Sequence, residues 1–209
     1  MRMQDHIPEA VKRLKLVGAF KGYNPGVLDC IEVSRDEKIM IVDDGEGTCI
    51  SKQDEDSYRC CLCINPNNNE IVVLPLDKRL IKQRVGGMAD GAVFDEQKFV
   101  FLEFKDQAQG NSYFAIEDTY TKASSQLSAA LNLFEESMAS VDVDFLNSVN
   151  VGCHIIVSDK FPRASALEQN MMLLFAINNN GVALSFEKEI MFNDLAERRG
   201  GLFSGHSIA

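Results

Sequence analysis

The sequence predicts an α/β fold in which helices cover both faces of a mixed β-sheet. Two observations support this prediction. Apolar residues recur at intervals of three and four over residues 112–138, which is typical of one long amphipathic helix. Strand–turn–strand patterns precede that helix, and single strands alternate with another helix after it. The expected order is helix, several antiparallel strands, helix, strand, helix and strand, which describes a layered α/β sandwich.

The first expected helix runs from Pro8 to about Val17. Proline suits the first helical position, and Glu9 lies in the first turn, where an acid interacts favourably with the helix dipole. Val11, Leu14 and Val17 form the apolar stripe of this helix.

A strand and a turn are expected after this helix. EKIMIV at 37–42 reads as a strand, and DDGEG at 43–47 ends it. The acids Asp43, Asp44 and Glu46 lack the full ligand spacing of a calcium loop, so we expect a turn there.

Two β-hairpins are expected before the long helix. YRCCLCI at 58–64 and EIVVLPL at 70–76 flank NPNNN, a cluster of turn residues. MADGAVF at 88–94 and FVFLEFK at 99–105 flank the polar segment DEQK, which gives the second hairpin.

The remaining elements follow the long helix. VGCHIIV at 151–157 predicts a strand covered on both sides. A capping box of Ser165 and Glu168 introduces another helix, which runs to an asparagine-rich turn. VALSF at 182–186 is the last expected strand, and the tail from about residue 200 is expected to be flexible.

Length and composition indicate one domain, residues 1–209, of ordinary globular character, with 45% hydrophobic and 25% charged residues. No apolar run approaches the roughly 18 residues that span a bilayer, and the amino terminus lacks the apolar segment of a signal peptide. We therefore expect a cytoplasmic protein without a membrane segment. The six cysteines are expected to be reduced thiols that act as small apolar residues.

The charge balance limits the kind of nucleic-acid contact that is expected. A formal net charge of −10 argues against nonspecific coating of nucleic acid, because phosphate neutralisation needs clustered Lys and Arg. One basic cluster nevertheless precedes the second hairpin: Lys78, Arg79, Lys82 and Arg84. This cluster is either a solvated face or a contact for a nucleic-acid backbone.

The second hairpin places two acids and a lysine in strands that are otherwise apolar. Glu103 and Lys105 share one face of their strand with Phe101. If DEQK forms a loop of even length, paired residue numbers sum to 193, and Asp90 stands opposite Glu103. Opposed residues have Cβ atoms about 4.5–5.5 Å apart, and like charges repel there. A bound Mg²⁺ or Mn²⁺ ion would remove this conflict, and an ion pair with Lys105 is the purely structural alternative.

Asp90, Glu103 and Lys105 resemble the PD-(D/E)xK signature of the restriction-endonuclease-like nuclease superfamily, with Ala89 where the motif proline often lies. The superfamily core has the order αβββαβ: a helix, a β-meander that carries the acids, a helix and a further strand, in a mixed central sheet flanked by helices. That order is similar to the one expected here over 8–157.

The resemblance implies a Mg²⁺- or Mn²⁺-dependent deoxyribonuclease that acts as an endonuclease. A homodimer would suit a cut on both strands. Asp90 and Glu103 would hold the metal, and Lys105 would orient or deprotonate a water molecule. Gln126, on the helix after the lysine strand, is a further catalytic candidate, and Glu9 is a candidate for an additional acid. RNA remains an alternative substrate. A rival interpretation is a catalytically silent nuclease-fold protein that binds a basic protein partner as an interaction or inhibitor module.

Overall fold

The computed structural model describes residues 6–45, 47–51, 60–81, 87–105 and 112–193. The helices are α1 (Glu9–Arg13), α2 (Leu16–Phe20), α3 (Val27–Cys30), α4 (Tyr113–Ala139), α5 (Phe145–Ser148) and α6 (Ser165–Asn178). The strands are β1 (Glu32–Ser34), β2 (Lys38–Asp43), β3 (Thr48–Ile50), β4 (Cys60–Ile64), β5 (Ile71–Pro75), β6 (Gly91–Phe94), β7 (Lys98–Lys105), β8 (Asn150–Val157), β9 (Ala183–Ser185) and β10 (Glu189–Met191).

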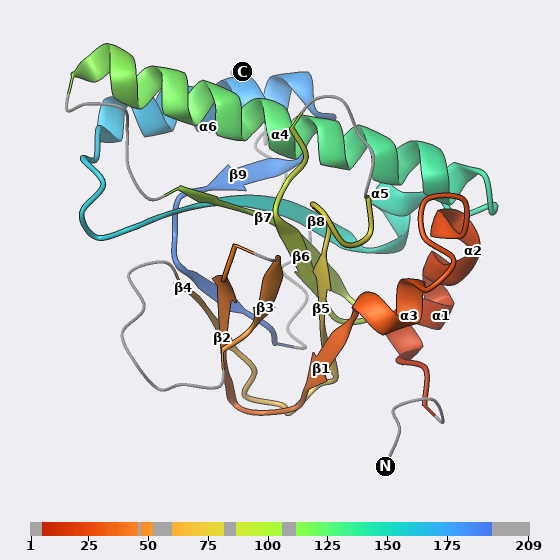
Figure 1. Cartoon of the computed structure of the whole chain (residues 1–209). Helices are drawn as coiled ribbons and strands as arrows, with labels where there is room; N and C mark the ends of the chain where they lie inside the picture. The colour runs from red at the N-terminus through yellow and green to blue at the C-terminus, as the bar shows by residue number, and fades with distance from the viewer. Residues whose placement is uncertain (1–5, 46, 52–59, 82–86, 106–111, 194–209) are drawn as a thin grey trace, which may run out of the picture.

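The strands form two sheets (Figure 1). Within the described residues, the larger sheet has the order β1–β5–β6–β7–β8–β9 and the smaller has the order β10–β4–β2–β3. Neighbours from β1 to β7 in the larger sheet are antiparallel, whereas β7, β8 and β9 are parallel. The parallel part requires crossover connections, which α4 and α6 provide. The expected α/β class is confirmed.

One face of the larger sheet packs against helices. The long helix α4 buries the apolar stripe that the sequence predicted, and its first turn is capped by Ser112, whose side chain accepts a hydrogen bond from the Ala115 amide. The Phe134 ring of α4 lies 5.3 Å from the Phe99 ring and 5.0 Å from the Phe101 ring of β7, measured between centroids. These aromatic contacts fix the helix over the centre of the sheet.

The other face of the larger sheet is covered by the smaller sheet. Ile41 of β2 and Cys63 of β4 pack in one buried cluster with Val100 and Leu102 of β7. The expectation of helices on both faces of the sheet is therefore wrong for this face.

All six cysteines are free thiols, as expected.

The first expected hairpin does not form, because β4 and β5 belong to different sheets. Strand β4 pairs with β2 and β10, whereas β5 pairs with β1 and β6. The fully buried Asn65 stabilises the connection between the two strands. Its side-chain amide nitrogen donates to the backbone carbonyls of Asp36 and Asn69, and its side-chain oxygen accepts from the backbone amide of Asn69. These contacts satisfy the backbone where the chain changes sheets.

The first expected helix is interrupted. It divides into α1 and α2 around Lys15, whose left-handed φ of 50° breaks the helical path. Val11 and Leu14 are buried as predicted, but Val17 is 37% exposed because the break turns it away from the core.

Helix α6 begins as predicted but without the expected capping box. The residue before its first turn, Ala164, makes no capping hydrogen bond through its side chain. Glu168 instead accepts two hydrogen bonds from the Arg163 guanidinium and one from the Tyr120 hydroxyl, at 2.8 Å. Glu168 therefore joins α6 to α4 rather than capping its own helix.

The chain continues past the last expected strand, β9, into β10, which the sequence did not predict. Strand β10 pairs in parallel with β4 and extends the smaller sheet. The tail that was expected to be flexible lies outside the described residues. In the parts of the chain that are described, no helix combines the length and apolar character needed to cross a bilayer.

The two sheets are in close contact at Gly91, so a substitution by alanine should affect stability differently at Gly91 and at Gly152. A Cβ atom on Gly91 would lie 2.5 Å from Thr48 Oγ1 of β3, whereas one on Gly152 of β8 would meet no atom within 4 Å. Gly91→Ala should therefore lower the free energy of unfolding by about 1–3 kcal/mol. The matched control Gly152→Ala should be neutral or stabilise by up to about 1 kcal/mol. Urea denaturation measures both, and equal effects would contradict this packing.

Candidate functional site

The β6–β7 hairpin has the register that the sequence predicted. Gly91 pairs with Leu102, so paired residue numbers sum to 193. One step further, Asp90 lies opposite Glu103, and two hydrogen bonds join Asp90 to β7, one to Glu103 and one to Phe104. Glu103 Oε2 accepts from the Asp90 amide at 3.2 Å, and Asp90 Oδ2 accepts from the Phe104 amide at 2.7 Å.

The alternation of side chains along β7 directs the polar groups toward the helix layer. Phe99 and Phe101 belong to the core cluster on the helix side, whereas Val100 and Leu102 belong to the cluster under the smaller sheet. Glu103 has the same parity as the helix-side residues. It therefore lies where α4 can contribute to the site.

Lys105 and Gln126 complete a connected polar group. Lys105 Nζ donates to Glu103 Oε1 at 2.5 Å and to Gln126 Oε1 at 3.0 Å. The Gln126 amide donates in turn to the Met88 carbonyl at 3.2 Å. Gly87 leaves room for this side chain, because a Cβ atom there would lie 2.7 Å from Gln126 Cγ. Four predicted site residues are thus brought together: Glu103 and Lys105 of β7, Gln126 of α4, and Asp90, which directly precedes β6.

Burial strongly perturbs the two acids. Glu103 is 1% exposed, and this desolvation, with a smaller contribution from the nearby Asp90 charge, raises its pKa to about 8 against the opposing effect of Lys105. Burial likewise raises the pKa of Asp90 to about 6, although the hydrogen bond from the Phe104 amide opposes the shift. Both carboxyls therefore titrate near neutral pH, which is typical of functional sites but also occurs in structural ion pairs.

Two further acids approach Asp90 that the sequence analysis did not assign to the site. The charges of Asp43 and Asp77 add to the upward shift of the Asp90 pKa. Asp43 ends β2 and Asp77 lies two residues after the end of β5, and this position after an apolar run was the signal available in the sequence. Asp43 also accepts a hydrogen bond from the Gly45 amide at 3.0 Å, which confirms the expected turn.

The Thr48 hydroxyl lies beside this region and is buried without a hydrogen-bond partner among the described residues. Thr48 pairs with Asp43 across the β2–β3 ladder and packs against Gly91, the neighbour of Asp90 in the chain. The smaller sheet thus reaches the edge of the larger sheet where the acids lie.

Half of the expected basic cluster can be located. Lys78 and Arg79 directly follow Asp77, and Lys78 Nζ donates to the Gly45 carbonyl at 2.8 Å. The Arg79 carbonyl accepts from the Asn24 side chain at 2.9 Å, which fixes the backbone of this segment. The other two members, Lys82 and Arg84, lie outside the described residues.

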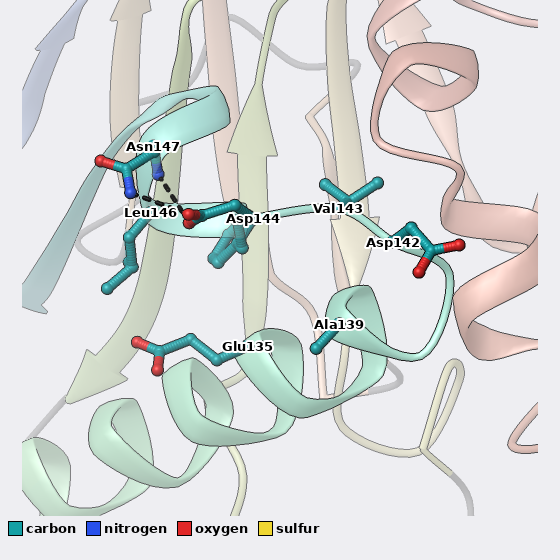
Figure 2. A pocket seen from close by; sticks show the side chains of 8 residues that line it. Glu135, Ala139, Asp142, Val143, Asp144, Leu146 and Asn147 are labelled. Atoms are coloured by element: carbon teal, nitrogen blue, oxygen red, sulfur yellow. Dashed lines mark hydrogen bonds between the residues drawn. The ribbon is translucent and has the colours of Figure 1, made fainter.

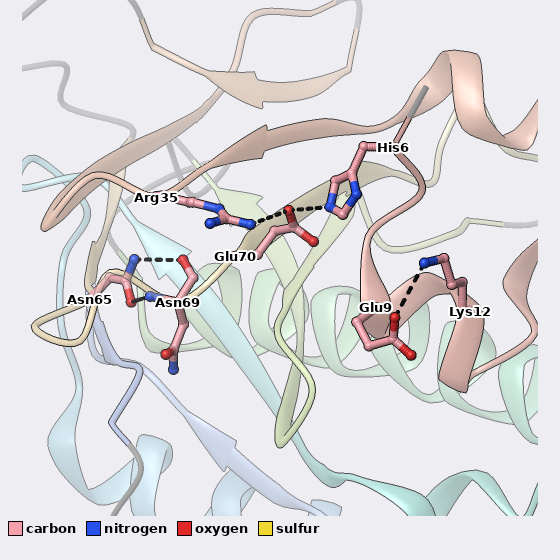
Figure 3. Close-up of polar contacts among 7 residues, drawn as sticks. All are labelled: His6, Glu9, Lys12, Arg35, Asn65, Asn69 and Glu70. Carbon is pink, nitrogen blue, oxygen red and sulfur yellow. Dashed lines mark hydrogen bonds and ion pairs between the residues drawn. The ribbon is translucent and has the colours of Figure 1, made fainter. Parts of the chain in front are cut away.

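Glu9 is not brought to the site. It lines a cavity of about 200 Å³ with Asp95 and Gln97, in the loop that joins β6 to β7. Asp95 is five positions from Asp90, or about 17 Å along a strand. The Glu9 carboxylate pairs with Lys12 at 3.3 Å. Figure 3 shows this pair beside a separate cluster around Glu70. The structure therefore gives Glu9 no part in the acid pair.

A second cavity, of about 580 Å³, lies between the end of α4 and the segment around α5 (Figure 2). Its polar lining includes Glu135, Asp142 and Asp144, and both carboxylate oxygens of Asp144 are engaged by Asn147. None of the predicted site residues that the structure describes lines this cavity.

Comparisons of this chain with models of protein families, with curated proteins and with solved structures find no match.

The raised pKa values predict how stability depends on pH in the absence of divalent cations. The folded chain keeps a proton on Glu103 between its ordinary pKa of 4.5 and about 8, whereas the unfolded chain releases it. The resulting stabilisation is present at low pH and is lost as the pH rises through this window. The free energy of unfolding of the wild type should therefore fall between pH 5 and pH 8 by at least about 1 kcal/mol more than that of Glu103→Gln.

Chemical denaturation in EDTA at several pH values measures this difference. Glu9→Gln, which changes an exposed acid away from the site, is the matched control and should follow the wild type. Parallel curves for the wild type and Glu103→Gln would show that Glu103 is ionised throughout the window.

Proposed function

We propose that this chain is a metal-dependent phosphodiesterase of nucleic acid, of the PD-(D/E)xK type, with DNA as its substrate. The observation that carries the proposal is the β6–β7 register. It sets the carboxyls of Asp90 and Glu103 side by side and holds Lys105 against both Glu103 and Gln126. Two acids and a lysine in this relation are the residues on which the resemblance depends.

The order of elements also supports the proposal. Helices α1 to α3 come first and, after the four strands β1 to β4, the antiparallel run β5–β6–β7, the helix α4 and the parallel strand β8 follow along the chain. This is the sequence of elements that the αβββαβ core requires. Under this proposal, the strands of the smaller sheet would be an addition to the core, and they cover the face where the resemblance would place a helix.

The donor set fits a hard divalent cation. Mg²⁺ prefers carboxylate oxygens and commonly keeps several waters, so two acids are sufficient protein ligands. The Asp90 charge is close enough to Glu103 to raise the pKa of that carboxyl, and Asp90 Oδ1 makes no hydrogen bond to the described residues. Asp90 is therefore the more accessible ligand. A bound ion would supply a water of lowered pKa and neutralise charge on the phosphate.

The other groups have roles that follow from their contacts. The Lys105 ammonium donates one proton to Glu103 and one to Gln126, which leaves its third proton for another acceptor. From there Lys105 would stabilise negative charge that develops on a phosphate oxygen, or orient the attacking water. Lys78 and Arg79, next to Asp77, would contact the nucleic-acid backbone, and binding should weaken with salt.

Cleavage assays test the proposal. With Mg²⁺ or Mn²⁺, wild type should cut linear or single-stranded DNA, and Glu103→Ala or Lys105→Ala should reduce the rate at least about 100-fold, because each removes a charge at the reacting phosphate. Glu9→Ala is the matched control and should retain the wild-type rate. Equal rates in all four proteins would remove the proposal, and cleavage of RNA alone would correct the substrate.

A catalytically silent nuclease-fold module is the second candidate, and one observation favours it. Both oxygens of the buried Glu103 carboxyl already accept hydrogen bonds, from Lys105 and from the Asp90 amide. Such a satisfied group needs no metal to be stable. The net charge of −10 would then serve to bind a basic protein.

Metal binding separates the two candidates. Because Glu103 must lose its proton to become a ligand, Mg²⁺ binding should release protons, and the apparent affinity should rise between pH 6 and pH 8 by up to about tenfold per pH unit. Isothermal titration calorimetry in two buffers of different ionisation enthalpy measures this release. Glu103→Gln should abolish it. A wild type that binds no Mg²⁺ or Mn²⁺ would support the silent module.

A further inference from the structure

The segment that follows β8 lies beside Lys105. Strands β7 and β8 are parallel neighbours in which Lys105 pairs with Val157, so both strands end at the same edge of the larger sheet. The Ser158 amide donates a hydrogen bond to the Lys105 carbonyl at 3.1 Å. In open α/β sheets, ligands bind beyond the carboxyl ends of the strands. The residues after β8 are therefore placed to contact a molecule that binds at Lys105.

Ser158, Asp159, Lys160 and Phe161 form a tight turn, which we call the β8 turn. The Phe161 amide donates to the Ser158 carbonyl at 2.9 Å, which closes the turn. The first and fourth Cα atoms of such a turn lie within about 7 Å of each other. Lys160, in the third position, is exposed. The turn keeps it close to Ser158, and so to the end of β7.

Contacts with the helix layer hold the β8 turn in place. Phe161 is 3% exposed, and its ring stacks on the Tyr120 ring of α4, with centroids 5.3 Å apart. Two residues further along the chain, the Arg163 guanidinium donates twice to the Glu168 carboxylate of α6, and the Tyr120 hydroxyl donates to the same group. A binding group on a segment that is already ordered loses less conformational entropy when a ligand binds.

The charges around Lys160 suit an anionic ligand. Asp159, the acid beside it in the turn, is paired with Lys188 at 2.5 Å. Glu168 is likewise paired with Arg163. The acids nearest to Lys160 in the chain are thus neutralised by other cations, and the Lys160 ammonium adds positive charge at this edge. A lysine binds phosphate as a point charge and needs no bidentate geometry.

Basic residues also stand on the other side of the acid pair along the same edge. Strand β5 is antiparallel to β6, and β6 to β7, so the carboxyl ends of β5, β7 and β8 all lie at one edge. Lys78 and Arg79 follow β5 there, and Asp90 directly precedes β6. Three strand spacings, or about 14 Å, separate β5 from β8, which is the axial length of roughly four nucleotides of one DNA strand.

We propose that the nucleic-acid backbone lies along this edge of the larger sheet from β5 to β8, and that Lys160 binds a phosphate on the side of the acid pair opposite to Lys78 and Arg79. The inference rests on the proposed function and adds to it the path of the substrate. Lys160 lies one strand spacing beyond Lys105, so it holds the substrate equally before and during hydrolysis. It is therefore a binding residue, not a catalytic one.

Binding of labelled linear DNA, followed by fluorescence anisotropy at several salt concentrations, tests this contact. Glu103→Gln serves as the parent, because cleavage would otherwise consume the probe. Adding Lys160→Ala should weaken binding about 10-fold. It should also make the slope of log Kd against log salt shallower by about 0.9, the contribution of one phosphate contact. Lys160→Arg should keep the affinity and slope of the parent, which separates the loss of a charge contact from a loss of folding.

Lys12→Ala is the matched control and should bind DNA like the parent, because Lys12 is an exposed lysine that pairs with Glu9 near the β6–β7 loop. Unchanged affinity and slope in Lys160→Ala, or an equal loss in Lys12→Ala, would overturn the inference, whereas cleavage by the wild type would leave the proposed function standing. Weaker binding by Lys160→Ala in a chain whose wild type does not cleave would support the path and remove the hydrolysis. A parent and a wild type that both bind no DNA would overturn the contact and the proposed function together.

Discussion

The paired acids of the β6–β7 hairpin impose the main constraint on this structure. Their carboxyls occupy adjacent positions at the end of a buried ladder, where a charge is costly unless a partner compensates for it. Lys105 supplies one compensation, and Gln126 holds that lysine in place. Helix α4 carries Gln126, and Gly87 leaves room for its side chain. The register of the hairpin places the two acids opposite each other.

Local patterns in the sequence were sufficient to predict this part of the fold. The period of two in β7 and the even-length loop fixed which side chains share a face, and so placed Asp90 opposite Glu103. The spacing of apolar residues likewise predicted α4 within a residue or two at each end. Gln126 could be proposed only from the resemblance, because its position beside the apolar stripe does not distinguish a site residue from a solvated one.

The parts that sequence reasoning missed depend on contacts between distant segments. No local sequence pattern distinguishes a turn that closes a hairpin from a turn that carries the chain to another sheet. The turn that Asn65 stabilises carries the chain from β4 in the smaller sheet to β5 in the larger sheet. The break at Lys15 and the use of Glu168 between helices are also tertiary effects. Asp43 and Asp77 escaped assignment for the same reason, since only the packing of the two sheets brings them near Asp90.

The path of the chain between the sheets has a consequence for how the molecule holds together. In the described residues it passes from the larger sheet at β1 to the smaller at β2, returns at β5, and crosses again between β9 and β10. The sheets are thus interlaced along the chain, and a cut that separates sequence halves leaves strands of both sheets on each fragment. Neither fragment would retain a complete layer, so limited proteolysis within the sandwich should yield pieces that stay associated or unfold together, not a surviving smaller unit.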